Sequence, residues 1–419
     1  MRSPLPVDSM ELPVPPGTTA IVVSDLHLRS APTLATTRLE TALVRRLDTL
    51  EAPAVLVLAG DILESLGEPT LRPREAFAAH PQLTQAIRRV ADTDGCSVVE
   101  LVGNHDANLA WDVEAAAEVS TATGATLALT ADLLTHTSSG CQRIRVEHGN
   151  RFDPYNRFED VRNPLDTPFG HHVVREVLPF VNEVAPDWLE GTTDLADPPD
   201  FPSFVGSRLA YRRLASHLRW LLIPLVLLMF VLRVPLVLIF TNRLPEDVRD
   251  WLRRSALIGG VLLVDVLVIA LIVIVFIRRS WQALRSLDLS DRGWGQNKAA
   301  RQEAERLAAT GYAGLICGHS HRPEITGLAE SAGFFANSGS ATPVVEAVPA
   351  RFGMPPVYLR YLQVSWLELR CGDGLTVELA MAETPLPGAT RLERYLAKRH
   401  PENHPEPVKV AGWPGGHWP

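Results

Sequence analysis

Residues 97–106 read SVVELVGNHD, an apolar run that ends in a glycine and three polar residues. The same pattern occurs upstream in TTAIVVSD (18–25) and AVLVLAGD (54–61), and the segments between these runs have helical periodicity. Short apolar runs that alternate with amphipathic helices are typical of βαβ units, in which the buried strands are parallel. We therefore expect a parallel sheet with helices beside it in the first third of the chain.

Further strands are predicted downstream from apolar runs that are bounded by turn residues. These runs are ATLALT (125–130), QRIRVEHGN (142–150), GYAGLICGH (311–319), GFFANSGS (333–340), VYLRYLQVSWLELRCG (357–372) and LTVELAM (375–381). The chain holds 419 residues, of which 46% are hydrophobic and 7% aromatic, which suffices for a packed core. We expect a folded α/β protein.

Charge and cysteine content exclude several classes of protein. The formal net charge is −8 and no basic patch stands out, which argues against a nucleic-acid partner. The four cysteines are scattered and form no CxxC pair, so neither a zinc ribbon nor a disulfide scaffold is indicated. The first residues, MRSPLPVDSMELPVPPG, lack the apolar core of a secretory signal, which predicts that they stay in the cytoplasm.

Polar residues close each predicted strand. They are Asp25 and His27 in SDLHL, Asp61 in LAGDIL, Asn104, His105 and Asp106 in VGNHD, His148 in EHGN, and His319 and His321 in ICGHSH. In open α/β sheets ligands bind at the ends of the strands, so these side chains are expected to converge. Their mixture of oxygen and nitrogen donors suits a pair of divalent cations such as Mn, Fe or Zn better than Ca or Mg alone.

The spacing within the motifs supports this interpretation. In DLH and HSH the two ligands are two residues apart, so on extended backbone their side chains point to the same face. Glycines precede Asp61, Asn104 and His319 and suit tight turns in which a side chain would obstruct the ligand. Each motif alone has a simpler explanation, because an aspartate at a strand end often caps a helix or a turn and a lone histidine often packs in a core.

The ordered series DLH, GD, GNHD, HG and GHSH resembles the calcineurin-like metallophosphoesterase superfamily, and ANSGS (336–340) resembles the Asn-x-Gly-Ser turn of that superfamily. The resemblance covers residues 18–150 and 311–380. It implies that Asp25, His27, Asp61 and His321 hold one cation and that Asp61, Asn104, His148 and His319 hold the other, with Asp61 as the bridge.

The resemblance also implies how the site would work. Two cations lower the pKa of a shared water and clamp the phosphoryl oxygens, and His105 would protonate the leaving oxygen while Asp106 orients it. Asn150 departs from the pattern, because many relatives have Asp or His at that position. SDLHL also resembles the UDP-diacylglucosamine hydrolases, but those typically have Arg where His105 stands, so their substrate is not assigned.

Some polar residues near the motifs belong to no motif. His171 and His172 are expected to be surface or core residues rather than ligands. Arg151, Asp153 and Asn156 in GNRFDPYN either touch the substrate or pack the loop, and the sequence leaves both possibilities open.

Two windows, 220–240 and 256–277, hold nearly uninterrupted Leu, Val and Ile. About 20 apolar residues cross a bilayer core as a helix, which predicts a two-helix transmembrane hairpin, with a buried hairpin in a soluble core as the alternative. Motifs lie on both sides of the windows, so the number of crossings must be even. More arginines flank the pair than lie in its loop, which predicts a cytoplasmic catalytic domain. Arg233 and Asp265 are predicted to face each other in the hairpin.

The sequence thus predicts an α/β fold, namely a four-layer αββα metallophosphoesterase sandwich with an inserted two-helix transmembrane hairpin. The predicted segments are a leader (1–17), the N-terminal part of the domain (18–150), a linking or lid segment with a basic amphipathic helix (151–219), the hairpin (220–277, with spans 220–240 and 256–277), the C-terminal part (278–400) and a flexible tail (401–419).

The predicted function is a two-metal hydrolase of a phosphate ester or pyrophosphate bond, acting on a lipid-linked substrate at the cytoplasmic face of the cell membrane. Its predicted partners are the lipid bilayer and a phosphorylated substrate, with a lipid as one candidate, but no nucleic acid. Two alternatives stay open. One is a membrane-anchored phosphodiesterase or phosphatase with a soluble substrate, and the other is a membrane scaffold without turnover.

Overall fold

The computed structural model of the chain describes residues 5–137, 140–177, 191–192, 201–214, 224–229, 231–232, 239, 245–248, 250, 257–285, 297–329, 332–400 and 403–414. The strands are β1 (Val7–Val14), β2 (Thr19–Val23), β3 (Ala54–Leu58), β4 (Cys96–Leu101), β5 (Thr126–Thr137), β6 (Gly140–Glu147), β7 (Tyr312–Cys317), β8 (Glu324–Gly327), β9 (Phe334–Asn337), β10 (Pro343–Val348), β11 (Val357–Cys371), β12 (Leu375–Pro385) and β13 (His404–Trp413). The α-helices are α1 (Leu34–Asp48), α2 (Pro73–Ala79), α3 (Pro81–Asp92), α4 (Val113–Thr123), α5 (Phe169–His172), α7 (Phe201–Arg208), α10 (Leu257–Arg285), α11 (Lys298–Ala309) and α12 (Arg391–Leu396).

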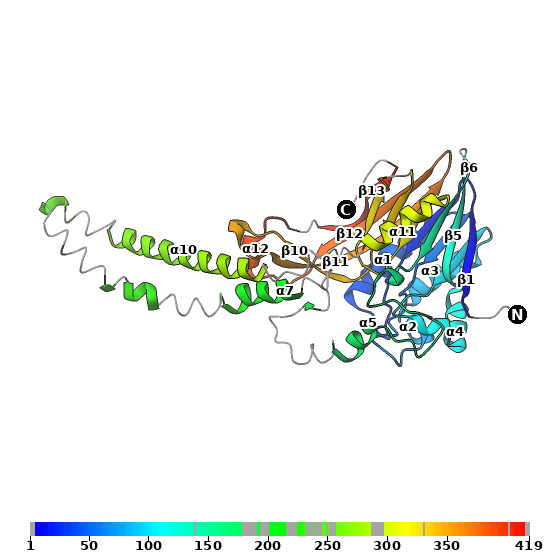
Figure 1. Cartoon of the computed structure of the whole chain (residues 1–419), viewed down its shortest axis with the longest axis horizontal. Coiled ribbons are helices and arrows are strands. Elements are labelled where there is room, and N and C mark those ends of the chain that lie inside the picture. The colour runs from blue at the N-terminus through cyan, green and yellow to red at the C-terminus, as the bar shows by residue number, and fades with distance from the viewer. Residues whose placement is uncertain are drawn as a thin grey trace.

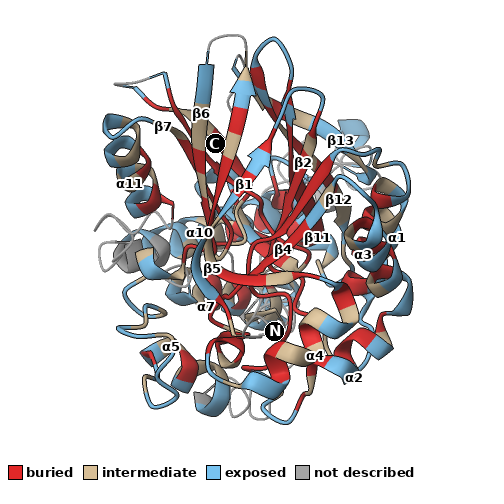
Figure 2. Ribbon diagram, turned by 90° about the vertical axis from the view of Figure 1, so that its right-hand side faces the viewer, coloured by how far each residue is buried: buried red, intermediate tan, exposed pale blue. Residues whose placement is uncertain are grey.

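Strands β2, β3, β4 and β5 pair in parallel in that order, as the βαβ pattern predicts. Their side chains alternate between two apolar cores. Ile21 of β2 lies in the core beneath α1, α3 and α4, whereas its neighbour Val22 lies in the core on the opposite face of the sheet. Because both faces of these strands are covered, their sequences are apolar throughout. Figure 2 shows this burial as red strands between outer helices.

The helical segment between β3 and β4 is divided into two helices. Helix α2 ends at Ala79, and α3 begins at Pro81 after the C-cap residue His80. Proline has no backbone N–H to continue the helical hydrogen bonds, but it is tolerated in the first turn of a new helix. The two helices thereby pack Phe77 and Leu83 into the same core.

The predicted four-layer sandwich is wrong, because the described strands form one continuous sheet that is nearly closed like a barrel. The path of eleven strands runs β13-β12-β11-β2-β3-β4-β5-β6-β7-β9-β8, with β1 beside β5 and β10 beside β11. The long strand β11 pairs with β2 through Leu367 and Val22, which joins the C-terminal strands to the N-terminal ones. The two ends of the path approach each other, because the ring centroids of Phe334 in β9 and Trp413 in β13 lie 4.9 Å apart.

The predicted transmembrane hairpin is also wrong. Across the described ranges, none of the helices combines the length and the hydrophobicity that crossing a bilayer requires. Only 224–229, 231–232 and 239 of the first window are described. Hydropathy predicted the spans from the average composition of each window, which tests only one of these two requirements. The multi-pass placement in the cell membrane, which depended on the hairpin, is corrected with it.

Residues 257–277 of the second window lie in α10, which extends away from the sheet in Figure 1. Asp265 is buried in this helix. Arg233, its predicted partner, lies outside the described residues, so that pairing stays a prediction.

Both ends of the chain differ from the predictions. The predicted leader contains β1, which pairs with β5 and buries Leu12 and Val14 in the core of the sheet. The predicted flexible tail contains β13, which pairs with β12 and places Trp413 against that core. Each segment is rich in proline, but its alternating apolar residues find a sheet edge, where proline is tolerated.

The predicted basic amphipathic helix is described only in part. Helix α7 ends at Arg208 and continues in a π-helical turn over Leu209–Leu214. Arg208 and Arg212 are not displayed on a solvated face, because both bind Glu393 of α12. The helix is therefore packed against α12 through its basic residues.

Candidate metal centre

The predicted ligands lie in the loops that follow β2, β3, β4, β6 and β7. Residues from these loops are brought together although the first and the last are nearly 300 positions apart. Three groups of side chains have potential ligand atoms close enough to hold a metal ion. These groups are Asp25, His27 and His321; Asp61, His148 and His319; and His27, Glu64 and His105.

Backbone strain marks the predicted ligands. Six non-glycine residues in the described part of the chain have positive φ, and five are predicted ligands: Asp25 (55°), His27 (46°), Asp61 (52°), His319 (68°) and His321 (55°). A left-handed backbone costs a residue with a side chain about 1 kcal/mol or more, and such strain clusters at functional sites. The prediction that DLH and HSH are extended is therefore wrong, because left-handed turns bring their side chains together.

Two neighbouring loops hold each other in these turns. The backbone N–H of Asp25 donates to the carbonyl of Gly60 at 3.0 Å, and that of His27 donates to the carbonyl of Asp61 at 3.0 Å. Parallel pairing therefore continues past the ends of β2 and β3. The two loops form one platform on which Asp25, His27 and Asp61 are fixed.

Glycines allow close approach at this platform, as predicted. Gly60 has a φ of +90°, and a Cβ atom there would lie 2.6 Å from Nδ1 of His148. A Cβ atom on Gly103 would collide with the carboxylate of Asp61. Larger residues at either position would displace a candidate ligand.

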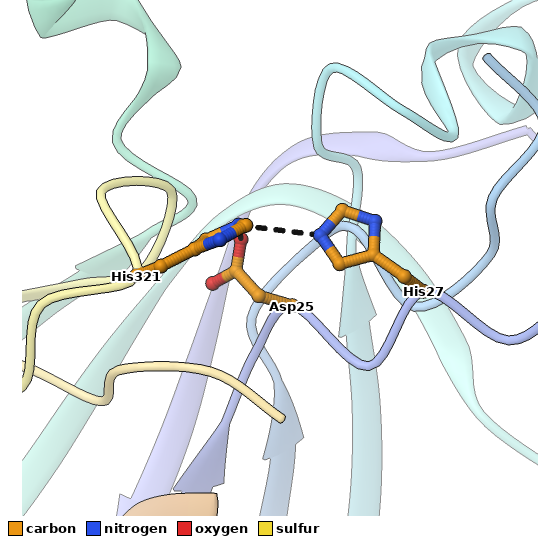
Figure 3. Close-up of side chains that lie close together, drawn as sticks. All are labelled: Asp25, His27 and His321. Atoms are coloured by element: carbon orange, nitrogen blue, oxygen red, sulfur yellow. Dashed lines mark hydrogen bonds and ion pairs between the residues drawn. The ribbon is translucent and has the colours of Figure 1, made fainter. Parts of the chain in front are cut away.

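The first group is shown in Figure 3, where Asp25 and His27 face His321 from the opposite loop. Nε2 of His321 lies 3.2 Å from Oδ1 of Asp25 and 3.3 Å from Nε2 of His27. Asp25 is fully buried, whereas the side chain of His321 is 33% exposed. The group is therefore accessible from the side of His321.

The second group is deeper. Nε2 of His148 lies 3.1 Å from Oδ2 of Asp61 and 3.1 Å from Oδ1 of Asn104. His319 completes the group with Asp61 and His148. Asp61, Asn104 and His148 are each 2% exposed or less. Burial disfavours the charged carboxylate of Asp61, but His148 and His105 outweigh it and hold its pKa well below the usual value.

His27 and His148 each have one ring nitrogen near an acceptor that is not among the predicted ligands. Nδ1 of His148 lies 3.0 Å from the carbonyl oxygen of Ala59, and Nδ1 of His27 lies 2.8 Å from Oε2 of Glu64. Metal-binding histidines commonly donate the proton of one ring nitrogen in this way, which leaves the lone pair of the other for the metal. The ring orientations of His27 and His148 thus suit ligation through Nε2.

One buried atom supports a cation at the first group. Oδ1 of Asp25 is buried and accepts no hydrogen bond from the described residues, and the ring nitrogen that lies 3.2 Å from it belongs to His321, another candidate ligand. A buried carboxylate oxygen without a donor is costly unless a positive charge neutralises it. Its other oxygen, Oδ2, accepts from Ser24 and from the backbone N–H of His319, so the side chain is fixed in this direction.

His105 lies between the groups and is held by Glu64, a residue that the sequence did not single out. Its Nδ1 lies 2.8 Å from Oε1 of Glu64, and its backbone N–H donates to Oδ1 of Asp61 at 2.7 Å. The ring packs edge-on against His27, with centroids 4.6 Å apart. Burial alone would lower the pKa of His105, but Asp61 and Glu64 raise it to about 9. Its imidazole is therefore protonated at neutral pH.

Asp106 does not make the predicted contact with the ring of His105. Its carboxylate accepts the backbone N–H groups of Gly103 at 2.7 Å and of Ile62 at 2.8 Å. These bonds join the loop after β4 to the loop after β3. Asp106 therefore braces the two loops, and Glu64 takes the orienting position that was predicted for it.

The remaining residues divide between the site and the surface. His171 contacts the site, because its Nε2 lies 3.1 Å from the carbonyl oxygen of Asn104, whereas the exposed His172 pairs with Glu176.

Asp153 also reaches the site, since its Oδ2 lies 3.1 Å from Nε2 of His319. Arg151 pairs with Glu147 and Glu303 instead. Asn156 and Asn150 bond within the loop.

The ANSGS segment supports the GHSH loop from behind. Nδ2 of Asn337 donates to the carbonyl of Gly318 at 2.6 Å and to Oγ of Ser320 at 3.0 Å. The buried amide thereby fixes the turn that carries His319 and His321.

Sequence reasoning missed Glu64 and left Asp153 undecided. Glu64 lies three residues after Asp61, and its position within the GDILE stretch was the available signal. Nothing in the sequence relates Asp153 to His319, because 166 positions separate them.

Comparison with protein-family models finds no match to this chain, and comparison with curated proteins finds none either.

Proposed function

We propose that this chain is a metal-dependent phosphoesterase of the calcineurin-like kind, which uses two divalent cations to hydrolyse a phosphate ester or pyrophosphate bond. The observation that carries the proposal is the position of His105, a half-buried imidazole that is not a predicted ligand. Its ring packs against His27 of the first group, and the backbone N–H of the same residue donates to Asp61 of the second. A proton donor beside two cation sites is the arrangement that phosphoryl transfer to water requires.

The residues have distinct parts in this proposal. Asp25, His27 and His321 would hold one cation, and Asp61, Asn104, His148 and His319 the other. Mn, Fe and Zn suit these donors. The cations would lower the pKa of a bound water and neutralise phosphoryl oxygens. Whether Asp61 bridges them stays part of the proposal.

His105 would donate the proton to the leaving oxygen. Because its Nδ1 faces Glu64, its Nε2 is the nitrogen left to act on a substrate. Glu64 keeps the ring oriented and favours its protonated form. The leaving oxygen would then depart as a neutral hydroxyl group, which lowers the barrier most for poor leaving groups.

The substrate is proposed only as a class. A lipid-linked substrate was inferred from the transmembrane hairpin, which the structure does not support. Phosphate esters and pyrophosphates remain, with lipids as one arm of the test. The net charge of −8 still argues against nucleic acid as a partner.

The experiment uses the full chain, stripped of metal and reloaded with Mn²⁺. Hydrolysis is measured with an aryl phosphate monoester, an aryl phosphodiester and a pyrophospholipid. Asp61→Asn is expected to reduce turnover to the protein-free level, whereas Asp94→Asn, at an exposed carboxylate before β4, should leave it unchanged. If the wild type shows no turnover above Asp61→Asn on any substrate, the enzyme proposal fails and a non-catalytic scaffold is favoured. Turnover of the soluble esters alone would exclude the lipid substrate.

A further inference from the structure

The loop from Asn150 to His172 belongs to none of the sequence motifs, yet it contacts two of the residues predicted to hold the second cation. At one end, Oδ2 of Asp153 lies 3.1 Å from Nε2 of His319. At the other end, Nε2 of His171 lies 3.1 Å from the carbonyl oxygen of Asn104. One loop thus touches both the loop after β4 and the loop after β7.

The carboxylate of Asp153 is held in a fixed direction. Nδ2 of Asn156 donates to its Oδ2 at 2.7 Å, and the backbone N–H of Tyr155 donates to its Oδ1 at 2.9 Å. Both oxygens therefore have donors from the loop itself. The contact with His319 is set by the loop and not by a freely rotating side chain.

The two ends of the loop are also joined to each other. The backbone N–H of Gly170 donates to the carbonyl of Tyr155 at 2.8 Å, and Nδ2 of Asn150 donates to the carbonyl of Asn156 at 3.1 Å. A Cβ atom at Gly170 would collide with the amide oxygen of Asn156. Asp153 and His171 consequently sit on one braced unit.

The contact between Asp153 and His319 indicates that Asp153 acts on this ligand and does not bind the cation itself. Asp153 lies outside the group formed by Asp61, His148 and His319. When a carboxylate accepts the proton on Nε2 of an imidazole, the lone pair is left on Nδ1. Outer partners of this kind orient a histidine ligand and typically change metal affinity by about 10- to 100-fold.

His171 acts on Asn104 in a comparable way. It is 7% exposed and packs edge-on against Phe158, with ring centroids 5.1 Å apart. Its ring nitrogen contacts the backbone of Asn104, whose side-chain oxygen lies 3.1 Å from Nε2 of His148. Fixing that backbone therefore fixes the amide beside the second group.

We propose that the loop Asn150–His172 is a clamp for the second cation, in which Asp153 positions His319 and His171 positions Asn104. This inference rests on the two-cation centre of the proposed function. It assigns positioning roles to two residues that the motifs do not include. It also predicts that the two cations respond differently to changes in the clamp.

The test is a calorimetric titration of the metal-free full chain with Mn²⁺. The wild type is expected to bind two ions, and Asp153→Asn should weaken one of them by about 10- to 100-fold while leaving the other unchanged. His171→Phe, which keeps an aromatic ring but removes the nitrogen, should weaken the same ion. Matched controls in the same loop are Asp160→Asn and His172→Phe, at exposed positions away from the site, and both should bind as the wild type does.

A second measurement does not depend on affinity. In the Zn²⁺-loaded wild type, ¹⁵N spectra of the histidine rings should show His319 protonated on Nε2, with the signal assigned by its loss in His319→Gln. Protonation on Nδ1 would overturn the role of Asp153 even if Asp153→Asn proved unstable.

The calorimetric outcomes separate the inference from the function. If Asp153→Asn binds both ions with the wild-type affinities, the clamp is overturned. The same holds if the variant binds both ions more weakly by the same factor. A wild type that binds fewer than two ions would overturn the clamp together with the two-cation centre. Selective weakening of one ion in a protein without turnover would support the clamp while the proposed enzyme activity fails.

Discussion

At the scale of single residues, Glu64 connects two histidines with different tasks. Its side chain is 5% exposed, and its two oxygens each lie 2.8 Å from a ring nitrogen, one of His27 and one of His105. Burial would raise the pKa of Glu64, but the two histidines outweigh it and hold that pKa below the ordinary value. One carboxylate therefore orients a candidate ligand and the candidate proton donor together.

Glu64→Gln should impair proton donation by His105 in addition to its effect on the candidate ligand His27. A carboxamide offers one acceptor oxygen instead of two, so it cannot accept from both histidines. An alkyl phosphate ester needs the proton for its leaving group, whereas a nitrophenyl ester does not. The loss of turnover should therefore be about tenfold or more greater with the alkyl ester than with the nitrophenyl ester. Steady-state assays of both esters measure this ratio. Glu68→Gln, which affects a partner of Arg29 and Ser30, is the control, and an equal fall with both esters in Glu64→Gln would contradict the prediction.

Glu100 of β4 is a second residue with a measurable signature. Both of its carboxylate oxygens are buried, and neither has a hydrogen-bond partner among the described residues. Burial, with a smaller effect from Asp106, raises its pKa well above the ordinary value of 4.5. Because the folded pKa lies above the unfolded one, its contribution to stability is fully present below about pH 4.5 and is lost as the pH rises toward the folded pKa.

The free energy of unfolding should therefore depend less on pH in Glu100→Gln. In the wild type this one group lowers that free energy by up to about 1.4 kcal/mol for each pH unit between its two pKa values. Denaturant titrations at pH 5 and pH 8 measure the difference between the proteins. Identical pH dependence in the wild type and in Glu100→Gln would show that Glu100 is not protonated in the folded state.

At the scale of elements, α7 and α12 are joined by a buried ionic cluster. Nη1 of Arg208 lies 2.7 Å from Oε1 of Glu393, and Nε of Arg212 lies 3.0 Å from the same oxygen. The other oxygen of Glu393 accepts the backbone N–H of Thr390 at 2.7 Å, which caps α12. The basic residues that predicted a surface helix are thus used for packing.

Glu393→Gln should be strongly destabilising. A glutamine can still cap α12, but it leaves the buried Arg208 without a negative partner, and such losses cost about 3 to 5 kcal/mol. The free energy of unfolding from denaturant titration measures this cost. Glu406→Gln breaks the exposed pair with Arg45 and should cost less than about 1 kcal/mol. Equal costs for the two variants would mean that the cluster contributes no more than a surface pair.

At the scale of the whole molecule, the candidate centre joins parts of the chain that are far apart in sequence. Asp25 and Asp61 come from the N-terminal strands, whereas His319 and His321 follow β7. Since β11 also pairs with β2, the two parts of the chain are joined both by the sheet and at the centre. Binding of cations should therefore stabilise the whole fold and not one loop.

Mn²⁺ should raise the melting temperature of the wild type. A cation present at about 100 times its dissociation constant stabilises the folded state by about 2.7 kcal/mol for one site. Differential scanning calorimetry with and without Mn²⁺ measures the shift. Asp61→Asn removes a charged ligand of the second group and should show a clearly smaller shift. An equal shift in both proteins would place the bound Mn²⁺ elsewhere.

Local patterns predicted most of the strands, because an apolar run reflects burial within one segment, but they did not predict β1, β8, β10 and β13. They also predicted where Asp25, Asp61 and His148 lie, since polar residues after apolar strands occupy the strand ends. The turns of Asp25 and His27 were not predictable in this way. Their positive φ values depend on the loop after β3, which holds them through backbone hydrogen bonds.

For residues 220–277, by contrast, hydropathy predicted two membrane-spanning helices that the structure does not bear out. It measures the average composition of a window, and none of the described helices combines that hydrophobicity with the length that crossing a bilayer requires. At the chain ends, the proline-rich composition predicted a leader and a flexible tail, but these segments form β1 and β13. At the chain ends the error arose because the partner strands β5 and β12 come from other parts of the sequence.

The sequence by itself determined which residues end the apolar strands and hence which donors can meet, because strand formation and its polar boundaries are local properties. The tertiary structure alone decided that the sheet nearly closes, that Glu64 and not Asp106 faces His105, and that Asp153 reaches His319. These contacts join residues from different loops. Their formation depends on the packing of both cores and the pairing of β11 with β2, which no single stretch of sequence contains.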